Sequence, residues 1–156
     1  MSRTAVRLAA SVAAAGLALT LSACSPVLSN VPYAASDGAR VVWQERNSPV
    51  RGENIVLVAS EEGAVARLVG GLTNTTADDV TVTLGFSDGP SRTISVGAGS
   101  TVLMGGEEQE EVLLDGVPGS PGSNVEMVFS TPDLGQISHL VPVLDGTFPQ
   151  YADLVP

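Results

Sequence analysis

The sequence predicts an all-β protein, an antiparallel β-sandwich of about 7–9 strands, and three observations support this prediction. From residue 40 onward, short runs of β-type residues are separated by Gly, Pro, Asn and Asp every 8 to 14 residues or so. The apolar residues of these runs are mostly valine with threonine nearby, and β-branched side chains suit a pleated surface better than a helix. No segment has a clear amphipathic-helix pattern, and the nearest one, residues 106–114 (GEEQEEVLL), is compatible with a short turn. An open barrel is the alternative arrangement of the same strands.

The first 24 residues have the pattern of an export signal that ends at a cysteine. Arg3 and Arg7 form a short positive region, residues 8–21 are apolar, and Leu21-Ser22-Ala23-Cys24 places small residues before a thiol. This ending resembles the lipobox of bacterial lipoproteins. The resemblance implies cleavage between Ala23 and Cys24 and a diacylglyceryl group on the Cys24 sulfur that holds the chain in the lipid bilayer. The alternatives are an uncleaved membrane anchor, for which the apolar run is short, and an ordinary secretory signal.

Four segments follow from this pattern. Residues 1–23 are the signal peptide, 24–39 the lipidated cysteine with a flexible linker rich in Ser, Ala and Pro, 40–145 the β-sandwich and 146–156 a C-terminal tail.

The charge of the chain limits its partners. After removal of the signal, the chain has five arginines and 17 acidic residues, which gives a formal charge of −12. Such a charge is repelled by phosphate backbones and anionic lipid surfaces, so we expect no nucleic-acid partner and no polybasic membrane contact. Because Cys24 is the only cysteine, the domain has no internal disulfide and depends on apolar burial.

The clearest strand is 79–86, in which Val80, Val82, Leu84 and Phe86 alternate with smaller or polar residues and define one buried face. The turn residues 74–78 (NTTAD) lie between this strand and the run 64–73, and they predict antiparallel pairing of the two. The other predicted strands are 40–44, 54–59, 92–96, 100–104, 112–114, 124–130 and 136–144.

Two further segments carry a resemblance that covers most of the chain. Together with the lipobox, ENIVLVASEEGAVARLVGGLTNTTADDVTVTL at 53–84 and VPVLDGTFPQYADLVP at 141–156 resemble small lipoproteins of high-GC Gram-positive bacteria, of the LpqE type. More distantly, the chain is similar to the periplasmic copper chaperones called PCuAC. The resemblance implies an immunoglobulin-like or cupredoxin-like β-sandwich and an extracytoplasmic location.

The copper chaperones bind Cu(I) through two histidines and two methionines, and this chain does not supply that set. After residue 23 it contains one histidine, His139, and two methionines, Met104 and Met127, whose spacing differs from the pattern of that family. His139 shares the apolar face of strand 136–144 with Ile137 and Val141, which favours a partly buried, hydrogen-bonded structural histidine. The alternative is a soft metal site made by His139 with Met104 and Met127 if their strands are neighbours. No cofactor is expected.

The sequence also offers little for catalysis. The one histidine lies on an apolar face and the one cysteine is expected to be acylated, so neither a Ser-His-Asp nor a Cys-His nucleophile is indicated. There is no H-E-x-x-H motif and no lysine. We therefore expect that the protein is not an enzyme.

The densest charge on the chain is the acidic run formed by Glu107, Glu108, Glu110 and Glu111. A solvated loop is the favoured interpretation, because the ordered spacing of a calcium-binding loop is missing. A calcium site and a contact with a basic patch of a protein partner are the alternatives.

Two aromatic residues, Phe148 and Tyr151, lie in the tail after the last predicted strand. The favoured interpretation is that they pack back over an edge or an open end of the sandwich. In the alternative they project outward and anchor a partner.

Two function classes remain open at this stage. The first is a non-catalytic binding or accessory module, tethered to the extracytoplasmic face of the cell membrane, that contacts an envelope protein. The second is a metal-handling protein descended from the copper chaperones.

Overall fold

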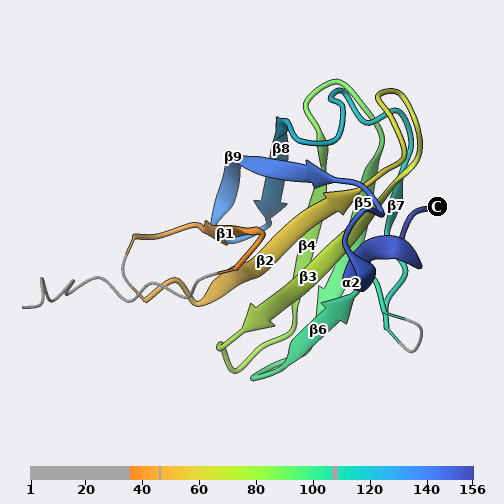
Figure 1. Cartoon of the computed structure of the whole chain (residues 1–156). Coiled ribbons are helices and arrows are strands. Elements are labelled where there is room, and N and C mark those ends of the chain that lie inside the picture. Colours follow the sequence, from red (N-terminus) through yellow and green to blue (C-terminus); the bar gives the residue numbers. More distant parts are fainter. Residues whose placement is uncertain (1–35, 46, 107–108) are drawn as a thin grey trace, which may run out of the picture. The chain divides into compact units, whose positions relative to one another are not determined.

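Nine β-strands and one short helix make up the computed structural model, which describes residues 36–45, 47–106 and 109–156 (Figure 1). The strands are β1 (Ala39–Val42), β2 (Val50–Val58), β3 (Ala66–Asn74), β4 (Val80–Phe86), β5 (Ser91–Val96), β6 (Thr101–Met104), β7 (Leu113–Leu114), β8 (Asn124–Thr131) and β9 (Gly135–Leu144). The helix α2 spans Pro149–Ala152 in the C-terminal tail and was not predicted from the sequence. All nine predicted strands are present, so the all-β fold class is confirmed.

The strands form two sheets that are joined through β9. One sheet contains β1, β2, β3, β6 and β7, and the other contains β4, β5, β8 and β9. Most of β9 pairs with β8, but Val143 and Leu144 at its end pair with Leu57 and Val58 of β2. A continuous path of hydrogen-bonded strands therefore runs in the order β5-β4-β8-β9-β2-β3-β6, an arrangement between a sandwich and an open barrel.

The pairing of β9 with β2 is parallel, whereas the sequence analysis expected an antiparallel sandwich throughout. The other strand pairs are antiparallel, as predicted. The difference arises because the end of β9 extends past the first residue of β8 and also reaches the first sheet, where β2 runs in the same direction. Crossing strands of this kind close the corner of a two-sheet structure.

The core lies between the two sheets and follows the alternation read from the sequence. In β4, Val82 and Leu84 are fully buried, while Thr81 and Thr83 lie on the outer face. The same alternation places Val125, Met127 and Phe129 of β8 in the core. Burial of these apolar side chains is the main favourable contribution to stability, at about 25 cal/mol per Å².

The prediction that 64–73 and 79–86 pair with each other is wrong. β3 pairs with β2, β6 and β7, whereas β4 pairs with β5 and β8 in the other sheet. The turn between β3 and β4 instead carries the chain from one sheet to the other. Its first residue, Asn74, is buried and its side-chain amide donates hydrogen bonds to the carbonyl oxygens of Asp78 and Val96, 2.8 and 3.1 Å away. An asparagine at a turn therefore stabilises a sheet-to-sheet connection here rather than a hairpin.

Strand β2 begins four residues earlier than predicted because it contains a β-bulge. Asn54 has a φ of 53°, in the left-handed region, and the register of β2 with β3 shifts between Glu53 and Val56. A β-bulge inserts an extra residue into one strand and bends it. The polar, glycine-containing stretch before Asn54 has the composition of a turn, but it continues the strand on the other side of the bulge.

Candidate functional site

The residues of the predicted lipobox, Ala23 and Cys24, and the linker up to residue 35 lie outside the described part of the chain. The first described residue is Ser36. In the part that is described, no helix has the length and hydrophobicity needed to span a bilayer.

Two of the three metal-ligand candidates lie side by side. His139 of β9 is the direct cross-strand partner of Met127 of β8, and cross-strand partners in an antiparallel pair share one face of the sheet. Met127 is fully buried in the core and His139 is partly buried at its margin. The hydrogen bond that we expected for the imidazole is absent among the described residues.

The third candidate, Met104, lies at the end of β6 in the other sheet, where its cross-strand partner is Gly70. It is buried in the core, and three strands separate β6 from β8 in the sheet order. Within the described residues, no group of three or more His, Cys, Asp or Glu side chains lies in a metal-binding arrangement.

The acidic run is partly described. Glu107 and Glu108 lie outside the described residues, whereas Glu110 and Glu111 are exposed. The backbone N–H of Glu110 donates to the carbonyl of Leu103, which holds this end of the loop against β6. The carboxylate of Glu111 lies 3.1 Å from Nη1 of Arg67, so one charge of the run is neutralised by an ion pair.

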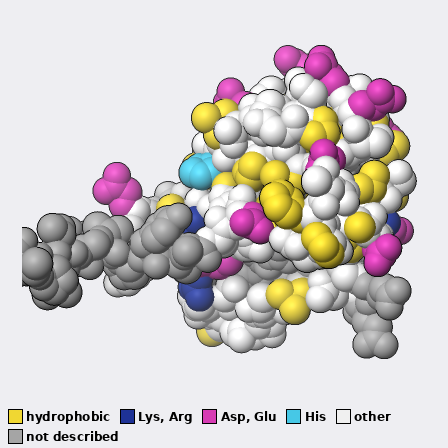
Figure 2. All heavy atoms as spheres, viewed as in Figure 1, with side chains coloured by type: hydrophobic (Ala, Val, Ile, Leu, Met, Phe, Trp, Pro, Cys, Tyr) yellow, Lys and Arg dark blue, Asp and Glu magenta, His cyan; other side chains and the backbone are white. Residues whose placement is uncertain are grey.

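The two aromatic residues of the tail have different environments. Tyr151 is 5% exposed and packs with Val56 and Val58 on the outer face of β2. Its hydroxyl donates a 2.9 Å hydrogen bond to Oδ2 of Asp37. Burial raises the pKa of the Tyr151 hydroxyl, and the hydrogen bond and negative charge of Asp37 raise it further. Phe148, at the N-cap of α2, is 56% exposed. Figure 2 shows hydrophobic side chains gathered on the face of the molecule that carries β9 and α2 in Figure 1.

The two aromatics of the tail therefore do not share one environment. Tyr151 packs back over β2, whereas Phe148 is exposed. The tail covers the outer face of β2 because Val56 and Val58 point away from the main core and need an apolar cover. Arg67 of β3 fixes the end of this cover, since its Nε donates to the carbonyl oxygen of Leu154 at 3.0 Å.

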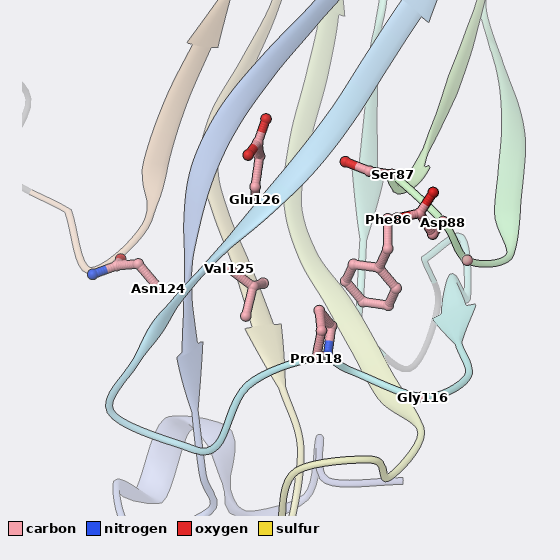
Figure 3. A pocket seen from close by; sticks show the side chains of 9 residues that line it. Phe86, Ser87, Asp88, Gly116, Pro118, Asn124, Val125 and Glu126 are labelled. Carbon is pink, nitrogen blue, oxygen red and sulfur yellow. The ribbon is translucent and has the colours of Figure 1, made fainter.

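A hollow of about 430 Å³ lies at one end of the sandwich, and the sequence did not indicate it. It is lined by the end of β4 and the β4–β5 turn, by the loop between β7 and β8, and by the start of β8. Figure 3 shows the Phe86 ring and Pro118 forming its apolar floor, with the carboxylates of Asp88 and Glu126 at its rim. Val125 adds a further apolar surface.

A second depression of about 360 Å³ adjoins the first, and the two share Phe86, Ser87 and Gly89. It runs over the outer face of β4, β8 and β9 and is lined largely by hydroxyl and amide side chains: Thr83, Ser87, Ser91, Ser130, Gln136 and Ser138. Together the two depressions offer an apolar floor, several neutral hydrogen-bonding groups and two carboxylates.

Sequence reasoning missed the hollow for a physical reason. Its walls come from two parts of the chain, within 86–89 and 116–126, that are separated by the strands β5, β6 and β7. The only local signal was the turn Ser87-Asp88-Gly89-Pro90, which is typical of a strand connection.

The comparisons with known proteins agree with this architecture. No family model and no curated protein matches the chain. Among solved structures, the apo PCuAC domain of PmoF2 matches with a TM-score of 0.50 and 15% identity, over 65% of this chain and 94% of that one. The copper-bound PCuAC domain from PmoF2 matches with a TM-score of 0.49 and 18% identity, over 63% of this chain and 94% of that one. The match to the apo domain confirms the distant similarity to PCuAC domains at the level of the fold.

Proposed function

We propose that this chain is a small lipoprotein of the LpqE type, held at the extracytoplasmic face of the cell membrane by diacylglycerol on Cys24. Its β-sandwich is a non-catalytic module that binds another envelope protein. Support for the anchor comes from the sequence Leu21-Ser22-Ala23-Cys24 at the end of the apolar leader. The described domain starts at Ser36, twelve positions after Cys24, and such a segment reaches at most about 40 Å. The module therefore works close to the membrane.

The observation that carries the binding role is the hollow beside Phe86. Binding residues are disproportionately found on loops that a rigid scaffold holds in place, and this hollow is formed by two loops and the ends of two strands. Its apolar floor would bury the hydrophobic part of a partner, while Asp88 and Glu126 at the rim select for basic or hydrogen-bond-donating groups.

The anchor is tested by replacing Cys24. In cells, the wild-type protein should fractionate with membranes and its N-terminal peptide should carry the mass of a diacylglyceryl cysteine. Cys24→Ser should release the protein into the soluble fraction. If Cys24→Ser still fractionates with membranes, the lipoprotein proposal is wrong.

The binding surface is tested by cross-linking in whole cells. A photoreactive residue at Ser87 should give one reproducible cross-linked protein, and the charge reversals Asp88→Arg and Glu126→Arg should abolish it. Asp153→Arg is the matched control, because Asp153 is exposed in the tail, outside the residues that line the hollow. Loss of the cross-link in the control as well would contradict a specific role of the hollow.

A second candidate function, copper handling, is supported by the fold of the apo PCuAC domain and by the cross-strand pair His139 and Met127. A thioether and an imidazole are suitable ligands for Cu(I). In this candidate the two side chains hold the ion at the margin of the core. Met104 is not part of the site.

The copper candidate is tested by titrating Cu(I) against a competing chelator. His139→Gln and Met127→Leu should each weaken binding strongly, and Met104→Leu should not. Both methionine substitutions conserve volume, so they leave the core intact. Binding weaker than about micromolar in the wild type removes this candidate.

A further inference from the structure

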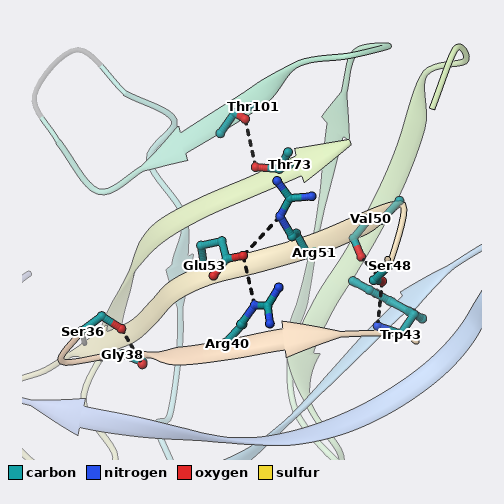
Figure 4. Close-up of polar contacts among 10 residues, drawn as sticks. All are labelled: Ser36, Gly38, Arg40, Trp43, Ser48, Val50, Arg51, Glu53, Thr73 and Thr101. Carbon is teal, nitrogen blue, oxygen red and sulfur yellow. Dashed lines mark hydrogen bonds and ion pairs between the residues drawn. The ribbon is translucent and has the colours of Figure 1, made fainter. Parts of the chain in front are cut away.

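A pair of arginines converges on one carboxylate on the outer face of the sheet formed by β1, β2, β3 and β6 (Figure 4). Nε of Arg40 and Nε of Arg51 each lie 3.2 Å from the same oxygen, Oε1 of Glu53. Two positive charges thus share one negative charge, and the cluster carries a local excess of one positive charge. After residue 23 the chain has only five arginines and no lysine against 17 acidic residues.

The ion pairs with Glu53 engage Nε and leave the terminal nitrogens of both guanidinium groups available to a ligand. The arginine side chains are 58% and 32% exposed for Arg40 and Arg51, and each approaches Glu53 through Nε alone. Within the described residues, no hydrogen bond involves the terminal nitrogens of either group. Paired terminal nitrogens are the edge through which arginine binds phosphate in a bidentate manner.

Stability does not account for the cluster. Exposed ion pairs contribute about 0–1 kcal/mol at most, and here two cations compete for one carboxylate oxygen. The cluster lies on the β-bulge at Asn54, whose positive φ is uncommon for a residue other than glycine. Bulges often re-aim side chains at functional sites, and this one shifts the register of β2 against both β1 and β3 beside Glu53.

Hydroxyl groups extend the cluster across the sheet. Arg51 lies opposite Thr73 of β3, and Thr73 lies opposite Thr101 of β6, with their Oγ1 atoms 2.9 Å apart. Figure 4 shows the Arg51 guanidinium extending toward Thr73. Next to this row, Gly71 occupies the position between Glu53 and Leu103 and leaves the surface without a side chain there.

We propose that Arg40 and Arg51, positioned by Glu53, bind a phosphate group, with one hydroxyl of the Thr73–Thr101 pair as an additional donor, because the other hydroxyl hydrogen lies between the two oxygens. Gly71 has no side chain beside Arg51, and a shift of the flexible Leu103 side chain, whose Cδ2 lies 3.3 Å from the position of a Cβ on Gly71, opens this place to the phosphate oxygens. The group belongs to a soluble phosphate ester or to a lipid headgroup, which share this chemistry. Phosphate binding at this site does not depend on acylation of Cys24. Its test is therefore independent of the test of the proposed lipid anchor.

The test is an NMR titration of the isotope-labelled full chain with inorganic phosphate, using chloride at matched ionic strength as the reference. We expect saturable shifts of the Nε–H signals of Arg40 and Arg51. Arg51→Gln should weaken phosphate binding about ten-fold. Arg92→Gln removes the same charge from β5, where the Arg92 side chain hydrogen-bonds only to the carbonyl of Ser91 among the described residues, and should leave affinity within about two-fold.

A second variant separates binding from folding. Gly71→Val places a β-branched side chain over the space beside Arg51, where its Cβ meets the flexible Leu103 side chain at 3.3 Å. We expect weaker phosphate binding with an unchanged or higher melting temperature, because valine favours a strand. Shifts equal to those in chloride, or equal losses in Arg51→Gln and Arg92→Gln, would overturn the proposal.

The source of the phosphate is distinguished with vesicles of phosphatidylcholine, with or without phosphatidylglycerol. Because the leader is common to all variants of the full chain, the ratio of wild-type to Arg51→Gln binding isolates the contribution of the arginine. If the wild-type protein binds the vesicles more strongly than Arg51→Gln does, and inorganic phosphate removes this difference, the site binds a lipid headgroup. A ratio of one, together with the NMR shifts, supports a soluble phosphate ester.

Discussion

The hydroxyl of Tyr151 donates a 2.9 Å hydrogen bond to Oδ2 of Asp37, which lies 114 positions earlier in the chain. This contact fastens the C-terminal tail to the start of the domain. It also places the tail over Val56 and Val58, which would otherwise expose their side chains on the outer face of β2.

The first prediction separates the ring of Tyr151 from its hydroxyl. Tyr151→Ala should reduce the free energy of unfolding by about 3 kcal/mol, because a large buried ring is lost. Tyr151→Phe should cost about 1 kcal/mol, the usual contribution of one hydrogen bond. Phe148→Ala is the control and should change stability by less than about 0.5 kcal/mol, because Phe148 is exposed. Urea denaturation followed by fluorescence of Trp43, the only tryptophan, measures all three.

The second prediction concerns alkaline pH. The folded state raises the pKa of the Tyr151 hydroxyl, chiefly through burial and then through Asp37. The stability that this group contributes is fully present below the pKa of an unfolded tyrosine, about 10, and is lost as the pH rises through the higher folded pKa. Wild-type protein should therefore lose more stability than Tyr151→Phe between about pH 9 and 11. Parallel losses in both proteins would contradict this assignment.

The third prediction concerns the sheet-to-sheet turn at Asn74. Its buried amide group donates to the carbonyls of Asp78 and Val96, and its Oδ1 accepts from the backbone N–H of Thr76 at 2.9 Å. Asn74→Ala removes all of these hydrogen bonds, only the carbonyl of Asp78 keeping another donor, the Thr76 hydroxyl, and should lower the melting temperature by an amount equivalent to about 2 kcal/mol. Thr93→Ala removes only an exposed hydroxyl pair and serves as the control. A similar effect of the two substitutions would mean that Asn74 is not the organising residue of the turn.

The fourth prediction concerns the attachment of the tail by Arg67. Its Nε donates to the carbonyl of Leu154, and its Nη1 pairs with Glu111. Arg67→Gln should increase amide hydrogen exchange in the tail and cost about 1 to 2 kcal/mol. Glu111→Gln should have a much smaller effect, since that carboxylate is largely exposed. Unchanged exchange at residues 149–155 in Arg67→Gln would show that packing alone holds the tail.

The sequence alone determined the secondary structure well, and β4 shows why. Alternation of Val80, Val82, Leu84 and Phe86 is a local property, because successive side chains of a strand point to opposite faces. Any pairing partner preserves it. The predicted strand boundaries were less accurate where the backbone is irregular. At Asn54, for example, the bulge in β2 has the composition of a turn.

The tertiary structure decided which strands pair and which residues meet. The turn at Asn74 leads from one sheet to the other, and β9 contacts β2 in parallel, because these choices depend on hydrogen bonds between segments distant in the chain. The cross-strand pair of Met127 and His139 arises in the same way.

The candidate sites follow the same division. The hollow beside Phe86 and the convergence of Arg40 and Arg51 on Glu53 have no signature in the sequence, because their residues come from different strands and loops. The lipobox at Cys24 is the opposite case, a predicted site defined by contiguous residues. A local pattern specifies which face of a strand is buried, but only the long-range packing of the sheets determines what that strand lies beside.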